Sequence, residues 1–155
     1  NLKIASKLPE LLFTPSSKAE IGSHDVNISF EKMSEVVGQD MSEKIKEISF
    51  KIFKKASDYL NTKNIILADT KFEFGLCNNG NLVLMDEILT SDSSRFWISE
   101  SYQEGVSPES LDKQFIRDYV KSISWDDSMP PPELPEDIVC KTFEKYKDLN
   151  RILMD

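Results

Sequence analysis

The chain reads Ala68-Asp69-Thr70-Lys71-Phe72-Glu73-Phe74-Gly75 and, after a short polar segment, Leu82-Val83-Leu84-Met85-Asp86-Glu87. Between these two runs lies Asn79-Gly80. This dipeptide is typical of a two-residue β-hairpin turn, because both of its residues must adopt positive φ. We therefore predict an antiparallel hairpin in which residues whose numbers sum to 159 face each other. This register places Glu73 opposite Asp86.

Alternation along the first strand puts Asp69, Lys71 and Glu73 on one face and two phenylalanines on the other. Two carboxylates that face each other across strands repel. The negative charges of Glu73 and Asp86 must therefore be compensated by a raised pKa, a neighbouring cation or a divalent metal. A magnesium ion is one solution, since it commonly takes one or two carboxylates together with substrate phosphates. A solvated hairpin in which Lys71 neutralises one acid is the alternative, and a one-residue slip in register would move Asp86 to the other face.

Composition narrows the class of protein. The 155 residues are 39% hydrophobic and 30% charged, which is typical of one globular domain with a core. A net charge of −8 argues against nonspecific binding to nucleic acid or to an anionic membrane. Two cysteines and one histidine cannot supply a four-ligand zinc site, and we expect reduced thiols in a cytoplasmic setting. The first residue is not methionine, so we expect a processed product or part of a longer chain.

The spacing of apolar residues, together with capping residues, glycines and prolines, predicts the remaining helices, strands and loops. We expect an irregular loop over 7–27, a short helix capped by Ser29 and stopped by Gly38, and a long helix opened by Asp40. A buried strand is predicted over 65–68, a polar loop over 90–97, and helices over 112–123 and from Pro135 onward. The apolar stripe of the long helix comprises Ile45, Ile48, Ile52, Phe53, Ala56, Tyr59 and Leu60. The stripe of the last helix comprises Ile138, Val139, Phe143, Tyr146 and Leu149.

Several motifs do not carry a function by themselves. Gly75 and Gly80 have the spacing of a phosphate-binding P-loop, but Asn81 follows where that motif needs lysine. A serine hydrolase is poorly supported, because His24 is the one histidine and no Gly-x-Ser-x-Gly occurs. The run Thr14-Pro-Ser-Ser-Lys18 suits an anion or a plain turn. Arg95 is either a clamp for a carboxylate or phosphate or the surface partner of Asp92.

Two further runs connect these residues to a known family. Ala68-Asp-Thr-Lys-Phe-Glu-Phe-Gly75, followed by Asp86-Glu-Ile-Leu-Thr-Ser-Asp-Ser-Ser-Arg-Phe-Trp97, closely resembles the signature of the phosphoribosylaminoimidazole-succinocarboxamide synthase (SAICAR synthetase) family. The resemblance extends through Phe13-Thr-Pro-Ser-Ser-Lys-Ala-Glu20, His24-Asp25 and Asp112-Lys-Gln-Phe-Ile-Arg-Asp118. Most of the chain is therefore similar to the C-terminal portion of that family.

The resemblance implies an ATP-dependent ligase of purine biosynthesis. Such an enzyme joins L-aspartate to carboxyaminoimidazole ribonucleotide and releases SAICAR, ADP and phosphate. The implied fold is α+β, namely the C-terminal lobe of a two-lobed, protein-kinase-like or ATP-grasp-like enzyme, with a central antiparallel hairpin packed by helices. The implied co-substrate is ATP, the implied cofactor is Mg²⁺, and the implied partner is the N-terminal lobe of the same enzyme, which has no counterpart in these residues. As it stands, the chain is then either half of a ligase or a noncatalytic fragment that needs that lobe.

Residue roles follow from the resemblance position by position. The magnesium and nucleotide carboxylates of the family fall on Glu73 and Asp86. The positions that hold the ribonucleotide fall on Lys71, Asp92 and Arg95, and Asp69 with Lys71 matches the catalytic cluster. The same resemblance makes Lys18 the weaker of the substrate-binding positions. Thr90-Ser91 departs from the usual Thr-Pro of the family, so we expect a looser loop before Asp92.

Overall fold

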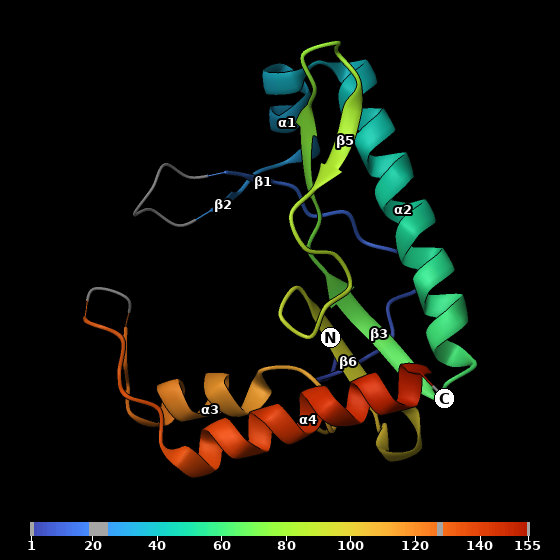
Figure 1. Ribbon diagram of the computed structural model, residues 1–155. Coiled ribbons are helices and arrows are strands. Elements are labelled where there is room, and N and C mark those ends of the chain that lie inside the picture. The colour runs from blue at the N-terminus through green and yellow to red at the C-terminus, as the bar shows by residue number, and fades with distance from the viewer. Residues whose placement is uncertain (1, 19–24, 127–128, 155) are drawn as a thin grey trace. The chain divides into compact units, whose positions relative to one another are not determined.

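The computed structural model describes residues 2–18, 25–126 and 129–154, and the prediction for His24 lies outside them. Helices and strands are mixed along the chain, as expected for an α+β protein (Figure 1). The elements, in chain order, are β1 (Ser16–Ser17), β2 (Val26–Asn27), α1 (Phe30–Val37), α2 (Gln39–Asn61), β3 (Ile65–Thr70), β4 (Glu73–Leu76), β5 (Leu82–Met85), β6 (Ser94–Ile98), the 3-10 turn η1 (Ser99–Ser101), α3 (Gln114–Ser122) and α4 (Glu136–Met154). The described strands form the antiparallel pairs β1–β2, β3–β6 and β4–β5.

The chain divides into two compact units. One unit comprises residues 7–55, and the other comprises the residues up to Ser6 together with those from Ala56 onward. The division falls inside α2. The assignment of the whole chain to a single catalytic lobe stays a prediction.

The 7–55 unit confirms the short capped helix. The Ser29 hydroxyl accepts a hydrogen bond from the Lys32 amide at 3.1 Å, as an N-cap does. Gly38 ends α1 with a φ of 88°, and its carbonyl accepts the Ser42 amide of the next helix. Because α2 thus begins at Gln39, Asp40 lies inside its first turn, and the prediction that Asp40 opens the helix is wrong.

Two further expectations for residues 7–61 change in detail. The segment predicted to be irregular contains the small antiparallel ribbon β1–β2, in which Ser17 pairs with Val26. In α2 the predicted stripe is half-buried or buried except at Tyr59, whose side chain is exposed. The Tyr59 hydroxyl donates to the Leu153 carbonyl at 3.1 Å, and this hydrogen bond holds the side chain at the surface.

The core of the second unit lies on β3 and β6. Ile65, Leu67 and Phe96 are buried, as is Leu111, whose amide donates to the Phe96 carbonyl. Ile65 pairs with Ile98 and Leu67 with Phe96, and Figure 1 shows the two strands side by side. The buried strand predicted at 65–68 is confirmed. The polar loop predicted for 90–97 is wrong in its second half, because Ser94 and Phe96 alternate as inward residues of a strand.

The hairpin β4–β5 forms, but in a different register from the predicted one. Glu73 pairs with Met85 and Leu76 with Leu82, so paired residue numbers sum to 158. The Cys77 amide donates to the Asn81 carbonyl at 2.9 Å, and the three residues between them form the loop. Gly80 has a φ of 78°, whereas Asn79 is not among the residues with positive φ. The turn is thus a three-residue loop closed by a left-handed glycine, and the prediction that Glu73 faces Asp86 directly is wrong.

Helices α3 and α4 pack against each other. The helix predicted over 112–123 is confirmed as Gln114–Ser122. In α4 the predicted stripe is wrong at Val139 and Phe143, which are 47% and 60% exposed, whereas Thr142 and Leu149 are buried. The Thr142 hydroxyl donates to the Ile138 carbonyl at 2.8 Å, which satisfies it within the helix. None of the helices in the described ranges is long and apolar enough to cross a membrane.

Candidate functional site

A β-bulge places the first pair of site residues. The register of β3 against β6 shifts between Leu67 and Asp69, so Ala68 is an extra residue without a partner in the ladder. Beyond the bulge Asp69 faces Arg95, and their side chains form an ion pair. Both side chains are about half exposed, so the pair is accessible to a ligand. The structure thus pairs Arg95 with Asp69, where the sequence had left its pairing with Asp92 open.

The second pair lies where β3 leaves the ladder. The Lys71 ammonium is 3.0 Å from the Glu73 carboxylate, whose side chain is 15% exposed. The Lys71 amide also donates to the Ser93 carbonyl at 2.9 Å, which brings Lys71 beside the segment before β6. Lys71 therefore neutralises one of the two acids, the arrangement left open as the alternative to a metal. It also lies within the same cluster as Asp92 and Arg95.

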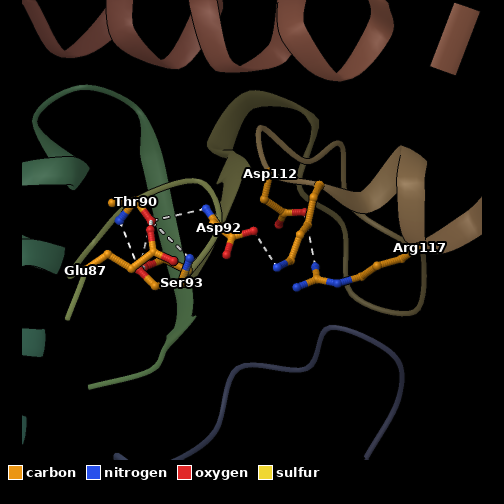
Figure 2. A network of polar contacts seen from close by, with 8 residues as sticks. Glu87, Thr90, Asp92, Ser93, Asp112 and Arg117 are labelled. Atoms are coloured by element: carbon orange, nitrogen blue, oxygen red, sulfur yellow. Dashed lines mark hydrogen bonds and ion pairs between the residues drawn. The ribbon is translucent and has the colours of Figure 1, made fainter. Parts of the chain in front are cut away.

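A closed turn precedes β6 (Figure 2). The Thr90 hydroxyl donates to Glu87 and accepts the amides of Asp92 and Ser93, at 3.3 and 3.1 Å. In return, the Ser93 hydroxyl accepts the Thr90 amide at 3.1 Å. These reciprocal bonds resemble a helix capping box and fix the turn without a proline. These hydrogen bonds hold the turn before Asp92, and the expectation that it is looser than the usual Thr-Pro loop stays a prediction.

Asp92 in turn contacts Lys113, a residue to which the sequence gave no role. Their side chains form an ion pair, and this hydrogen bond is the main reason why the pKa of Asp92 lies below its usual value. A hydrogen bond with the Glu87 side chain and, to a smaller extent, the positive charge of Arg117 lower the same pKa further. Lys113 and Arg117 are four residues apart, a spacing that places side chains on one helical face and could have flagged them.

Asp112 is the second group that the sequence missed. Its side chain is completely buried, and its two oxygens accept hydrogen bonds from the Ser110 hydroxyl and from the Arg117 guanidinium, the latter at 3.2 Å. Burial, together with the negative charges of Asp92 and Asp112, raises the pKa of Tyr146 on α4. A buried aspartate is uncommon because its charge must be compensated, and no periodicity in the sequence reports burial of this kind.

The residues expected to hold magnesium remain neighbours in the hairpin. Glu73 pairs with Met85, and Asp86 follows directly, in the left-handed region with a φ of 61°. Among the residues that the structure describes, no cluster of three or more acidic, histidine or cysteine side chains could hold a metal. Two carboxylates completed by phosphate oxygens and water would suit magnesium, but the observed register places Glu73 opposite Met85 and not opposite Asp86, so the magnesium site stays a prediction.

The last two sequence predictions concern Lys18 and the cysteines. Lys18 is exposed and belongs to the 7–55 unit, whereas all the other candidate residues belong to the second unit. Cys77 and Cys140 are free thiols and both are exposed, and the expectation of a reducing setting stays a prediction.

Comparisons with known proteins agree on one family. A family model described as SAICAR synthetase matches residues 1–132. The phosphoribosylaminoimidazole-succinocarboxamide synthases of Histophilus somni and Thermodesulfovibrio yellowstonii are 51% and 55% identical to this chain, over 96% of its length in each case. The alignments cover 52% and 50% of those relatives, so the chain spans about half the length of the curated relatives it matches.

Solved structures give the same result. The SAICAR synthase of Saccharomyces cerevisiae complexed with SAICAR aligns with 99% of this chain and 49% of its own, with a TM-score of 0.80 and 42% identity. A SAICAR synthetase in complex with ADP aligns with 95% of this chain and 52% of its own, with a TM-score of 0.70 and 30% identity. On this evidence the chain belongs to the SAICAR synthetase family.

Proposed function

We propose that the chain supplies the ribonucleotide-binding and metal-binding part of an ATP-dependent ligase that joins L-aspartate to carboxyaminoimidazole ribonucleotide. The observation that carries this proposal is the gathering of cations at one end of β3 and β6. Arg95 pairs with Asp69 and Lys113 pairs with Asp92, while the Lys71 ammonium pairs with Glu73 and the Lys71 amide donates to the Ser93 carbonyl. Each of these cations is balanced by a carboxylate, and an exposed guanidinium or ammonium group can exchange such a partner for the carboxylate or phosphate of a ligand.

We assign some residues of the candidate site to the ribonucleotide and others to the metal ion. Arg95 and Lys71 orient the carboxylate of the ribonucleotide, because a guanidinium presents two parallel donors and an ammonium adds a point charge. Asp69 holds Arg95 in place, and Asp92 belongs to the same binding site. Glu73 and Asp86 would hold Mg²⁺, whose chemistry is to neutralise the phosphates of ATP. The relative in complex with ADP supports nucleotide binding in the family.

The proposed reaction has two steps. The substrate carboxylate, already anionic at neutral pH, attacks the γ-phosphorus of ATP and forms an acyl phosphate while ADP leaves. The amine of L-aspartate then attacks the acyl carbon, loses a proton and expels phosphate, which leaves an amide. Lys71 and Arg95 contribute by fixing the carboxylate near the phosphoryl group. A cytoplasmic setting and the protein-kinase-like lobe architecture belong to the same proposal.

Isothermal titration of the 155-residue chain with SAICAR tests the binding role. We expect saturable binding that Arg95→Lys weakens about tenfold or more, because a lysine cannot replace the bidentate fork. Arg151→Lys is the matched control, since Arg151 pairs with Asp148 on the surface of α4 and lies outside the cluster. Equal affinity of the wild type and Arg95→Lys would contradict the proposal, as would the absence of any binding by the wild type.

A second candidate is a unit that binds the ribonucleotide without turning it over. It is favoured by the observation that the chain spans about half the length of its relatives. ATP-dependent formation of SAICAR by the chain distinguishes the two candidates. Turnover that Asp86→Asn reduces by orders of magnitude supports the ligase, whereas SAICAR binding without turnover supports the binding unit. The expected partner in the second case is the N-terminal lobe of the same enzyme.

A further inference from the structure

The buried carboxylate of Asp112 has no part in the function proposed so far. Its side chain is 0% exposed in a region where the neighbouring ion pairs are largely open to solvent. Removing a carboxylate from water is costly unless hydrogen bonds and an opposite charge compensate it. The Ser110 hydroxyl and the Arg117 guanidinium provide this compensation, one at each oxygen.

Asp112 is attached firmly to the strand that carries Arg95. The Leu111 amide donates to the Phe96 carbonyl at 2.8 Å, and Ser110 bridges to Trp97. Leu111 and Phe96 are both buried, which fixes this attachment by packing as well as by hydrogen bonds. The position of Asp112 relative to β6 is therefore set by the core.

From this fixed point two cations extend toward the candidate site. Lys113 follows Asp112 in the chain and pairs with Asp92, and Arg117 pairs with Asp112 itself (Figure 2). Asp92 belongs to the closed turn of Thr90 and Ser93, which leads directly into Arg95. The chain thus connects the buried carboxylate to Asp92 through Lys113, and Arg117, held by Asp112, adds a positive charge that acts on Asp92.

We propose that Asp112 is a positioning residue, which holds Lys113 and Arg117 against the Asp92 turn and thereby preorganises the ribonucleotide site. Asp112 touches no substrate in this proposal; it acts through its two cationic neighbours. The binding part of the inference rests on the proposed function, whereas the placement of Lys113 by Asp112 does not.

Titration of the Asp92 carboxyl by carbon-13 NMR, in the wild type and in Asp112→Asn, tests the placement. The two effects of the substitution have opposite signs. Removing the negative charge of Asp112 would by itself lower the pKa of Asp92, whereas releasing Lys113 would raise it toward its ordinary value. We expect the pKa to rise. An unchanged or lower pKa would overturn the proposal, and a purely structural role of Asp112 would not produce the rise.

Asp118→Asn is the matched control. Asp118 is an exposed carboxylate on α3 that accepts a hydrogen bond from Gln114 at 2.8 Å, so the same chemical change there should leave the pKa of Asp92 unaltered. If Asp112→Asn does not fold, Ser110→Ala serves instead, because it removes one hydrogen bond to Asp112 and no charge. A rise in the pKa of Asp92 in Ser110→Ala supports the proposal, and no change overturns it.

Affinity for SAICAR tests the consequence. We expect Asp112→Asn to bind about tenfold more weakly than the wild type and Asp118→Asn, at a temperature where melting curves show all three to be folded. Wild-type affinity in a folded but less stable Asp112→Asn would overturn the positioning role. Should the wild type itself not bind SAICAR, the proposed function fails, and the NMR titration still decides the placement of Lys113.

Discussion

The strand pairs β3–β6 and β4–β5 are both antiparallel, yet different features fix their registers. In β3–β6 three apolar residues are almost completely buried, namely Ile65, Leu67 and Phe96. In β4–β5 every side chain is half-buried or exposed. A slip by one residue would turn the apolar residues of β3 toward solvent, whereas the hairpin loses much less by slipping. Burial therefore sets the register of β3–β6, and the turn sets that of β4–β5.

The largest expected difference between the two pairs concerns their phenylalanines. Phe96→Ala removes a buried ring from β6 and should lower the free energy of unfolding by about 3–5 kcal/mol. Phe74→Ala in β4, where the ring is half-buried, should cost roughly half as much. Urea unfolding of both variants gives the comparison. Equal losses would show that the hairpin carries as much of the core as β6 does.

The hairpin turn provides the next test. Gly80→Ala should lower the free energy of unfolding by about 1–2 kcal/mol, because alanine is strained at a φ of 78°. Asn79→Ala should cost only about 0.5 kcal/mol or less, since Asn79 is not left-handed and contributes one 3.2 Å hydrogen bond to the Asn81 amide. A similar cost at both positions would instead favour the two-residue turn that the sequence predicted.

The ion pair at the end of β3–β6 should matter more for binding than for stability. Asp69→Asn should lower the free energy of unfolding by about 0.2–1 kcal/mol, because both partners are half exposed. The same variant should lose affinity for SAICAR, since Arg95 is no longer held. Chemical denaturation and isothermal titration on one preparation measure both effects. A large loss of stability with unchanged affinity for SAICAR would show that the ion pair stabilises the fold and does not contribute to binding.

The smallest expected effect depends on pH. The pKa of Asp92 lies below its ordinary value of 3.8, chiefly because of the hydrogen bond from Lys113. The stabilisation is thus fully present above the ordinary pKa and is lost as pH falls through the lower pKa of the folded state. Because Asp92 is more than half exposed, the free energy of unfolding of the wild type should exceed that of Lys113→Met by about 0.5 kcal/mol or less at neutral pH. A difference that grows as pH falls below 3.8 would contradict this assignment.

Local signals in the sequence predicted the helices well. Ser29 and Gly38 bound α1 because a hydroxyl cap and a left-handed glycine act within a few residues. The run Ile65-Ile66-Leu67 was recognisable as a buried strand, but its partner β6 was not, because Ser94 and Arg95 are polar and their pairing is nonlocal. Val139 and Phe143 show the converse error, since apolar spacing in α4 does not tell which side finds a neighbour.

The candidate site was predictable to the extent that it resembles a family signature. That signature gave Asp69, Lys71, Glu73, Asp86, Asp92 and Arg95. The pairing among these residues was not predictable, because it depends on the bulge at Ala68 and on the three-residue hairpin loop. Asp112 and Lys113 lay in the run that resembles the family but received no role, since their contacts follow from burial and from an ion pair between distant segments.

The extra residue at Ala68 has a consequence for how this strand can evolve. Inward residues occur at odd positions up to Leu67, and the ladder then resumes with Asp69 facing Arg95 in a shifted phase. In a regular strand, the core residues and the charged residues at its end would follow the same inward and outward alternation. Any insertion or deletion would then change the facing of both. The bulge separates them. Core side chains and candidate-site side chains on β3 are therefore free to diversify independently, although only one residue stands between them.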